Sequence, residues 1–127
     1  MWTLIHYEEY DQMAVMQWAK ISEAIWPELK LLFHIPNGGK RNVREAAMLK
    51  AAGVKAGVPD LFLPVPRGRF FGLWIELKHG ANKATDLQKK WIADLKEQGY
   101  MAEVAVGSEA AIQLLKDYME MEERRND

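Results

Sequence analysis

Two short strings of residues constrain this chain more than any other feature. Gly57-Val58-Pro59-Asp60 places a carboxylate at the start of an expected strand. Ile75-Glu76-Leu77-Lys78 places a second carboxylate and an ammonium group at the end of the next one. Successive side chains of a strand point to opposite faces, so Glu76 and Lys78 share a face, roughly 7 Å apart. Two acids and a base in a small volume suit a hard divalent cation, which prefers oxygen ligands.

An alternative interpretation treats Glu76 and Lys78 as solvated positions on an edge strand, because the pattern Glu-x-Lys is common by itself. The segment from Phe70 to Leu77 is almost wholly apolar, however, as expected of a strand buried on both faces. A charged pair at the end of such a strand needs a compensating partner, since burying an unpaired charge is costly. We therefore expect a functional site here.

The residues between the two strings predict how they meet. A turn from Pro64 to Arg69 joins two expected strands, 61–65 and 70–77, as a hairpin. This antiparallel pairing places Asp60 beside Glu76. A helix and a further strand, 100–106, follow, and such a crossover gives a parallel neighbour. We therefore expect an α/β fold with a mixed central sheet flanked by helices.

The helices contribute polar residues whose roles the sequence leaves open. A first helix is expected from Glu8 to Trp26. Its apolar stripe comprises Val15, Trp18, Ile21 and Ile25. Glu8 and Asp11 either complement the positive end of this helix or point toward the metal site. Gln88 either serves only the capping box that Thr85 opens or also supports the site.

Smaller signals complete the expected elements. Residues 31–35 predict a short strand, in which His34 is better explained as a packed or hydrogen-bonded residue than as a metal ligand. Residues 43–52 favour a helix. Ser108 is expected to cap a final helix, and the charged tail from about residue 120 is expected to fray.

Composition narrows the classes of protein that remain. The 127 residues suit one domain, 1–127, and the net charge of −1 requires any nucleic-acid surface to be local. Without cysteine, disulfides and thiolate metal sites are excluded. No signal peptide or membrane span is apparent, so we expect a cytoplasmic protein.

Basic residues do cluster locally between the first strand and Asp60. A loop rich in Pro, Asn and Gly carries Asn37, and this region could contact phosphates or be a solvated helix face. The cations in it are Lys40, Arg41, Arg44, Lys50 and Lys55.

The order of these motifs resembles the PD-(D/E)XK nuclease superfamily, and the fuller string resembles the virus-type replication-repair nuclease (VRR-NUC) family. The resemblance runs from about Glu8 to Tyr118. Its matching pieces are His34-Ile-Pro-Asn-Gly-Gly39, Gly53-Val-Lys-Ala-Gly-Val-Pro-Asp-Leu61, Ile75-Glu-Leu-Lys78 and the helix with Gln88. It implies a restriction-endonuclease-like core. Stand-alone phage-type members of the family are small homodimers associated with metal-dependent cleavage of branched DNA, such as four-way junctions.

The resemblance also implies roles for individual residues. Asp60 and Glu76 would hold Mg²⁺ or Mn²⁺, and the backbone carbonyl of Leu77 would complete the set. Lys78 would orient or deprotonate the attacking water, or steady the charge on phosphorus, and Gln88 would support the site. The family also uses a glutamate on the first helix. One alignment offers Glu8 for it, and another offers Asp11.

Two functions other than that of a DNA endonuclease are conceivable for this sequence. A non-catalytic nucleic-acid-binding module would use the basic loop and treat the acidic pocket as structural, but the intact set of Asp60, Glu76 and Lys78 argues against it. A hydrolase of small phosphate esters would need a deep nucleotide pocket, of which the sequence gives no sign.

Overall fold

The centre of the molecule is a four-stranded mixed sheet in a computed structural model that describes residues 7–36 and 42–123. The strands are β1 (Phe33–His34), β2 (Leu61–Leu63), β3 (Leu73–Lys78) and β4 (Met101–Val106), and they lie side by side in this order. β1, β2 and β3 pair antiparallel, whereas β3 and β4 pair parallel. The expected α/β fold with a mixed sheet is therefore confirmed.

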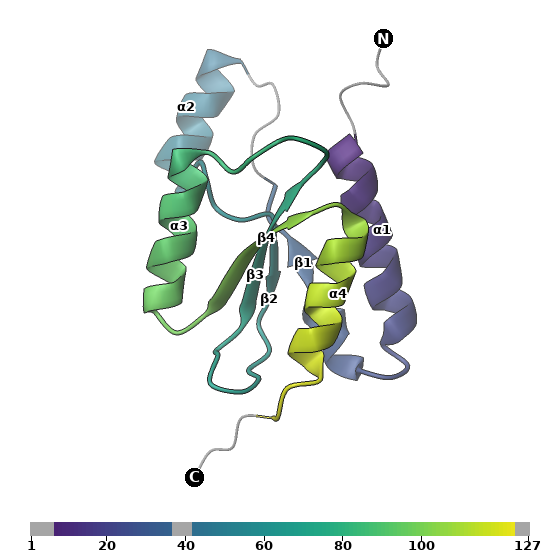
Figure 1. The fold of residues 1–127 in the computed structure, drawn as a ribbon. Coiled ribbons are helices and arrows are strands. Elements are labelled where there is room, and N and C mark those ends of the chain that lie inside the picture. Colours follow the sequence, from purple (N-terminus) through teal and green to yellow (C-terminus); the bar gives the residue numbers. More distant parts are fainter. Residues whose placement is uncertain (1–6, 37–41, 124–127) are drawn as a thin grey trace.

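Helices cover both faces of this sheet, as Figure 1 shows. α1 and α4 pack on one face, and α3 packs on the other, next to β4. The helices are α1 (Tyr7–Ser22), α2 (Val43–Ala51), α3 (Asp86–Glu97) and α4 (Ser108–Met119), with a 3-10 helix at Pro27–Leu31. None of the described helices combines the length and the apolar character needed to cross a lipid bilayer.

The main core lies between the sheet and the pair formed by α1 and α4. Leu61, Leu73 and Ile75 point into it from the strands, and Leu115 and Tyr118 point into it from α4. Tyr118 is fully buried, and its hydroxyl donates a 2.6 Å hydrogen bond to the carbonyl oxygen of Val65. Burial raises the pKa of this phenol to about 12. This packing makes the strands a rigid base for the residues at their ends.

Helix α1 is shorter than expected, and its buried stripe differs. It ends at Ser22, whose carbonyl accepts the amides of Ile25 and Trp26. Ile21 and Ile25 are each 70 % exposed, so the prediction that they face the core was wrong. The buried residues are instead Val15, Ala19 and Ser22. Ala19 and Ser22 are small, and small side chains let a helix approach its neighbours closely.

The ends of several other elements also differ from those expected. β1 has two residues rather than five, because Leu31 ends the 3-10 helix. β2 stops at Leu63, and β3 begins only at Leu73. The cap of α4 is Gly107, with a φ of +87°, and no side chain caps this helix. A positive φ favours glycine, so Ser108 becomes the first helical residue instead of the expected cap.

The start of the charged tail is ordered against the hairpin turn. The amide of Gly68 donates a 2.7 Å hydrogen bond to the carbonyl of Glu122, and Arg67 pairs with Glu123 as an isolated β-bridge. Arg67 is itself buried and forms a 2.7 Å ion pair with Glu28. Residues 120–123 therefore do not fray as expected, and residues 124–127 lie outside the described part.

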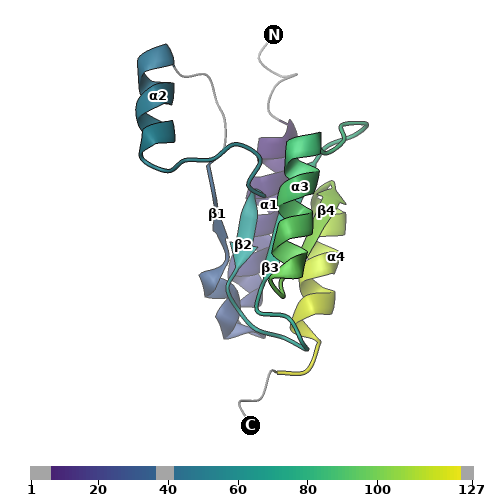
Figure 2. The ribbon, with the colours of Figure 1, turned by 90° about the vertical axis from the view of Figure 1, so that its left-hand side faces the viewer.

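Helix α2 stands apart from the other layers, which is clearest in Figure 2. None of its residues is buried, and Val43 and Met48 expose much of their apolar side chains. Asn42 caps it by accepting a 2.7 Å hydrogen bond from the amide of Glu45. Local interactions therefore contribute to this helix, whose side chains bury little against the other described elements.

Candidate metal and phosphodiester site

The two predicted carboxylates meet at one end of the sheet. Leu61 pairs with Ile75 in the antiparallel register of β2 and β3, so Asp60 and Glu76 are the next residues to face each other. Asp60 Oδ2 also accepts a 2.8 Å hydrogen bond from the amide of Leu77. The hairpin thus brings together the two acids, as its lengths predicted.

The loop before Asp60 is fixed by its approach to α3. Gly57 has a φ of +89°, and a Cβ atom there would lie 2.7 Å from Leu87 Cγ and 3.0 Å from Trp91 Cδ1. Trp91 Nε1 donates a 3.1 Å hydrogen bond to the carbonyl of Ala56. Only glycine combines this backbone conformation with this close approach. The glycine in the string before Asp60 therefore docks the loop on α3 and sets where the carboxylate lies.

Glu76 is almost completely buried, and only one of its two carboxylate oxygens contacts a hydrogen-bond donor in the described part of the chain. The residue is 2 % exposed. Its Oε2 atom accepts a 3.1 Å hydrogen bond from Gln88 Nε2 and lies 3.4 Å from Lys78 Nζ. Its Oε1 atom is buried and accepts no hydrogen bond from the described residues, although a proton held by Glu76 can be shared with Asp60. A buried polar atom without a partner is costly, so this oxygen is a natural position for a ligand such as a cation.

Gln88 makes both of the contacts that the sequence left open, one with the helix cap and one with Glu76. Its Oε1 atom accepts a 2.8 Å hydrogen bond from the amide of Thr85, and the Thr85 hydroxyl accepts the amide of Gln88. This capping box fixes which end of the side-chain amide faces the helix start. The Nε2 group is consequently directed at Glu76. The cap of α3 therefore orients a donor toward the buried carboxylate.

The raised pKa values of Asp60 and Glu76 indicate that their carboxylates lack sufficient compensating positive charge among the described residues. Burial raises the pKa of Asp60, and the amide of Leu77 partly opposes this. Burial, followed by the neighbouring charge of Asp60, raises the pKa of Glu76 to about 8, against the favourable charge of Lys78. Two close carboxylates cannot both ionise cheaply in a buried site. A bound cation would remove this conflict.

The donor set fits Mg²⁺ or Mn²⁺ held by few protein ligands. No group of three His, Cys, Asp or Glu side chains with metal-ligand spacing occurs in residues 7–36 and 42–123. The third protein donor would be the carbonyl of Leu77. Because the two backbone polar groups of a strand residue point the same way, this carbonyl faces the side of Asp60, as its amide does. Two carboxylates, one carbonyl and waters suit Mg²⁺, which keeps several waters.

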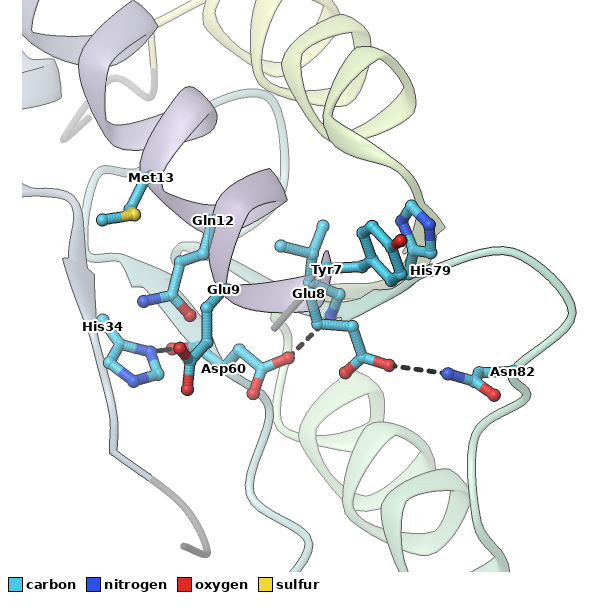
Figure 3. Close-up of a pocket in the computed structure, with 10 residues that line it drawn as sticks. Tyr7, Glu8, Glu9, Gln12, Met13, His34, Asp60, His79 and Asn82 are labelled. Atoms are coloured by element: carbon cyan, nitrogen blue, oxygen red, sulfur yellow. Dashed lines mark hydrogen bonds between the residues drawn. The ribbon is translucent and has the colours of Figure 1, made fainter. Parts of the chain in front are cut away.

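A cavity of about 570 Å³ opens beside Asp60 and Leu77 at the start of α1. Figure 3 shows the side chains that surround it. It is lined by Tyr7, Glu8, Glu9, Gln12, Met13, His34, Asp60, Leu77, His79 and Asn82. The sequence had not singled out Glu9, Gln12, His79 or Asn82, because nothing local marks residues that become neighbours only through the fold. The cavity reaches Asp60, whereas neither Glu76 nor Lys78 lines it.

The two acids of α1 lie differently with respect to this cavity. Asp11 Oδ2 pairs with His79 Nδ1 at 2.7 Å, and Asp11 is not among the cavity-lining residues. Glu8 lines the cavity, accepts a 3.1 Å hydrogen bond from Asn82 Nδ2, and its charge contributes to the raised pKa of Asp60. The structure therefore brings Glu8 to the site and engages Asp11 elsewhere.

His34 supports Asp60 through the backbone. Its Nδ1 atom donates a 2.9 Å hydrogen bond to the carbonyl of Asp60, which also accepts the amide of Ile35 at 2.7 Å. This hydrogen-bonded role in a strand matches the expectation for His34. The contact ties β1 to the residue that carries the first carboxylate.

The predicted basic surface is only partly described. Asn37, Lys40 and Arg41 lie outside the described residues. Arg44 and Lys55 are exposed, on α2 and in the loop that follows it, and neither lines the cavity. Their contact with nucleic acid stays a prediction.

The fold and this arrangement of residues define the PD-(D/E)XK class, in which paired acids and a lysine sit at the end of a mixed sheet. A family model described as the VRR-NUC domain matches residues 2–109. This chain belongs to the VRR-NUC family, and that membership implies a nuclease-type function.

A solved structure supports the same assignment. The structure titled "VRR_NUC domain protein" is similar to this chain with a TM-score of 0.78 and 34 % sequence identity, over 92 % of this chain and 91 % of that one. A comparison with curated proteins finds no match.

Proposed function

We propose that this protein is a Mg²⁺- or Mn²⁺-dependent DNA endonuclease that hydrolyses phosphodiester bonds, with Asp60, Glu76 and the carbonyl of Leu77 as metal ligands. The observation that carries this proposal is the buried Oε1 atom of Glu76, which accepts no hydrogen bond from the described residues and belongs to a carboxyl group facing Asp60. The raised pKa values of Asp60 and Glu76 show that it is unfavourable to bury both acids in ionised form. A purely structural pocket would not need to keep the two acids together.

Hydrolysis of a phosphodiester needs neutralised charge, an activated water and a stabilised leaving oxygen, and bound divalent cations can supply all three. Lys78 is 8 % exposed and lies 3.4 Å from Glu76, so its ammonium group is held at the carboxylate pair, where it would orient the water or steady charge on phosphorus. Gln88 fixes the rotamer of Glu76. Glu8 would hold water at the cavity side of Asp60.

Cleavage assays test this proposal directly. Linear, nicked, flapped and four-way DNA would each be incubated with Mg²⁺ or Mn²⁺. We expect Asp60→Asn and Glu76→Gln to abolish cleavage while DNA binding survives, and Lys78→Ala to lower turnover by orders of magnitude. Lys89→Ala, on the exposed side of α3, is the matched control for loss of a positive charge. Near-normal turnover by either acid variant would refute the assignment, and binding without any cleavage by the unaltered protein would support a non-catalytic binding module.

Branched DNA as the substrate and a homodimer as the active form belong together in this proposal. A four-way junction requires two cuts, which a twofold dimer supplies with two equivalent sites. Helix α2 supports a dimer, because it buries no side chain within its own chain and exposes Val43 and Met48. We expect light scattering to give the mass of a dimer and Met48→Glu to weaken it. A monomer at micromolar concentration that still resolves junctions symmetrically would contradict this part.

A further inference from the structure

Two aromatic rings stack beside the candidate site, at the start of α1. The centroids of Tyr7 and His79 lie 4.8 Å apart, and the ring planes differ by 12°. Both residues line the cavity that also contains Asp60, and Figure 3 shows them next to Glu8. Tyr7 is 45 % exposed, so much of its ring is open to solvent. An aromatic surface is therefore presented to whatever enters the cavity.

Two hydrogen bonds between α1 and the loop after β3 hold His79 beside Tyr7. Asp11 Oδ2 accepts the proton of His79 Nδ1 at 2.7 Å, which fixes the orientation of the imidazole. Asn82 Nδ2 donates to Glu8 and ties the same loop to the same helix turn. Two polar contacts already anchor the loop to α1, so the exposed stack is not needed for that purpose alone. Asp11 thus acts as a positioning residue for the ring of His79.

The chemistry of the surroundings indicates which part of a nucleic acid would meet these rings. The cavity carries the carboxylates of Glu8, Glu9 and Asp60, which repel phosphate groups that no cation neutralises. A nucleobase is uncharged and has an aromatic face. Stacking of bases on aromatic side chains is a general means of binding unpaired nucleotides.

We propose that the Tyr7–His79 stack is a platform for an unstacked nucleobase next to the phosphate that is cut. This inference rests on the proposed function, since DNA must enter the cavity. A branch point or flap offers a base that is free to leave its stack, whereas a continuous duplex must first be opened at an energetic cost. The platform would therefore contribute to a preference for branched over linear DNA.

Fluorescence of 2-aminopurine tests the proposal without cleavage. The base analogue would be placed in turn at each nucleotide around the branch of a four-way junction. Binding would be followed with Mg²⁺ in a Lys78→Ala background, which is expected to bind the metal without cutting the DNA. We expect position-specific quenching on binding. Tyr7→Leu should remove it and weaken junction binding roughly 5- to 100-fold, with a smaller effect on linear duplex.

Matched variants separate stacking from other effects. Tyr7→Phe keeps the ring and should keep both signals. Tyr10→Leu removes an aromatic residue of similar exposure, 51 %, that does not line the cavity, and should change neither. His79→Gln removes the ring but retains a hydrogen-bond donor for Asp11, and it should weaken quenching. This variant tests the proposal if Tyr7→Leu does not fold.

The outcomes distinguish this inference from the proposed function. Cleavage of junctions with no quenched position, or equal binding by Tyr7→Leu and Tyr10→Leu, overturns the platform and leaves the nuclease standing. Quenching that depends on Tyr7 in a protein that cuts nothing supports the platform and refutes the nuclease.

Discussion

Replacing Glu76 by glutamine should stabilise the metal-free protein, and increasingly so as the pH rises. Burial and the charge of Asp60 raise the pKa of Glu76 from 4.5 to about 8. The native state therefore keeps a proton on Glu76 that the unfolded chain loses. Because the native state binds more protons, the contribution of Glu76 to stability is complete below pH 4.5, falls between pH 4.5 and about 8, and stays low above that.

The size of the effect follows from the same pKa values. Each pKa unit corresponds to about 1.4 kcal/mol, so a rise from 4.5 to about 8 sets an upper bound of roughly 5 kcal/mol. Relaxation and water entry around an ionised buried group reduce such penalties, and we expect about 2 kcal/mol. Glutamine keeps an oxygen that can accept from Gln88 and carries no charge. For a chain of this length, 2 kcal/mol raises the unfolding midpoint by roughly 6–10 °C.

The assay is thermal and urea unfolding at pH 5, 7 and 9 with a chelator present. We expect the free energy of unfolding of Glu76→Gln, minus that of the unaltered protein, to increase by about 2 kcal/mol from pH 5 to pH 9. Glu97→Gln makes the same change at an exposed position of α3 and controls for net charge. A difference that is constant with pH, or that decreases toward pH 9, would show that Glu76 does not keep its proton in the native state.

Two further predictions concern the elements that hold the carboxylates. Gly57→Ala should cost about 2–4 kcal/mol of stability in urea unfolding, since the new Cβ meets α3 at 2.7 Å and φ is +89°. Gly53→Ala, where φ is +106° and nothing lies within 4 Å, should cost only about 1 kcal/mol, and equal costs would contradict the close-approach argument. Gln88→Glu keeps an acceptor for the capping box but replaces the donor to Glu76 by a negative charge, so metal-free stability above pH 8 should fall and cleavage should slow at least tenfold. Unchanged turnover in this variant would limit Gln88 to the helix cap.

Local patterns made the centre of the site predictable. Side chains of a strand alternate with a period of two, and a short turn sets the register of a hairpin, so the neighbourhood of Asp60 and Glu76 follows from residue spacing. The capping box of Thr85 and Gln88 also depends only on residues three apart. Gly57 has a positive φ and lies close to α3, so the glycine of the string before Asp60 meets a requirement of the backbone.

Helical spacing alone did not show which face of α1 is buried. Ile21 and Ile25 fit an apolar stripe, yet the helix ends at Ser22 and the small residues Ala19 and Ser22 face inward. Apolar side chains favour burial, but the closeness with which a helix packs depends on partners that the local sequence does not identify. The same limitation applies to α2, whose helical propensity was recognised although none of its residues is buried.

Contacts between segments far apart in the sequence decide which acid of α1 faces the cavity, and the sequence alone could not predict them. Asp11 and His79 are 68 positions apart, and Glu8 and Asn82 are 74 apart. No periodicity connects such residues, so the sequence left Glu8 and Asp11 as alternatives. The tertiary fold separates them, because α1 presents Glu8 to the cavity while His79 engages Asp11.

The carboxylates of Asp60 and Glu76 are proposed to hold one divalent cation between them. Calorimetric titration of Mn²⁺ into the unaltered protein, Asp60→Asn, Glu76→Gln and Lys78→Ala, at pH 6.5 and pH 8, measures whether they do. We predict tighter binding at pH 8, since the cation must displace the proton that Glu76 keeps. Binding should be lost in both acid variants and kept in Lys78→Ala. Unchanged Mn²⁺ affinity in Asp60→Asn and Glu76→Gln would show that these two carboxylates do not bind the cation.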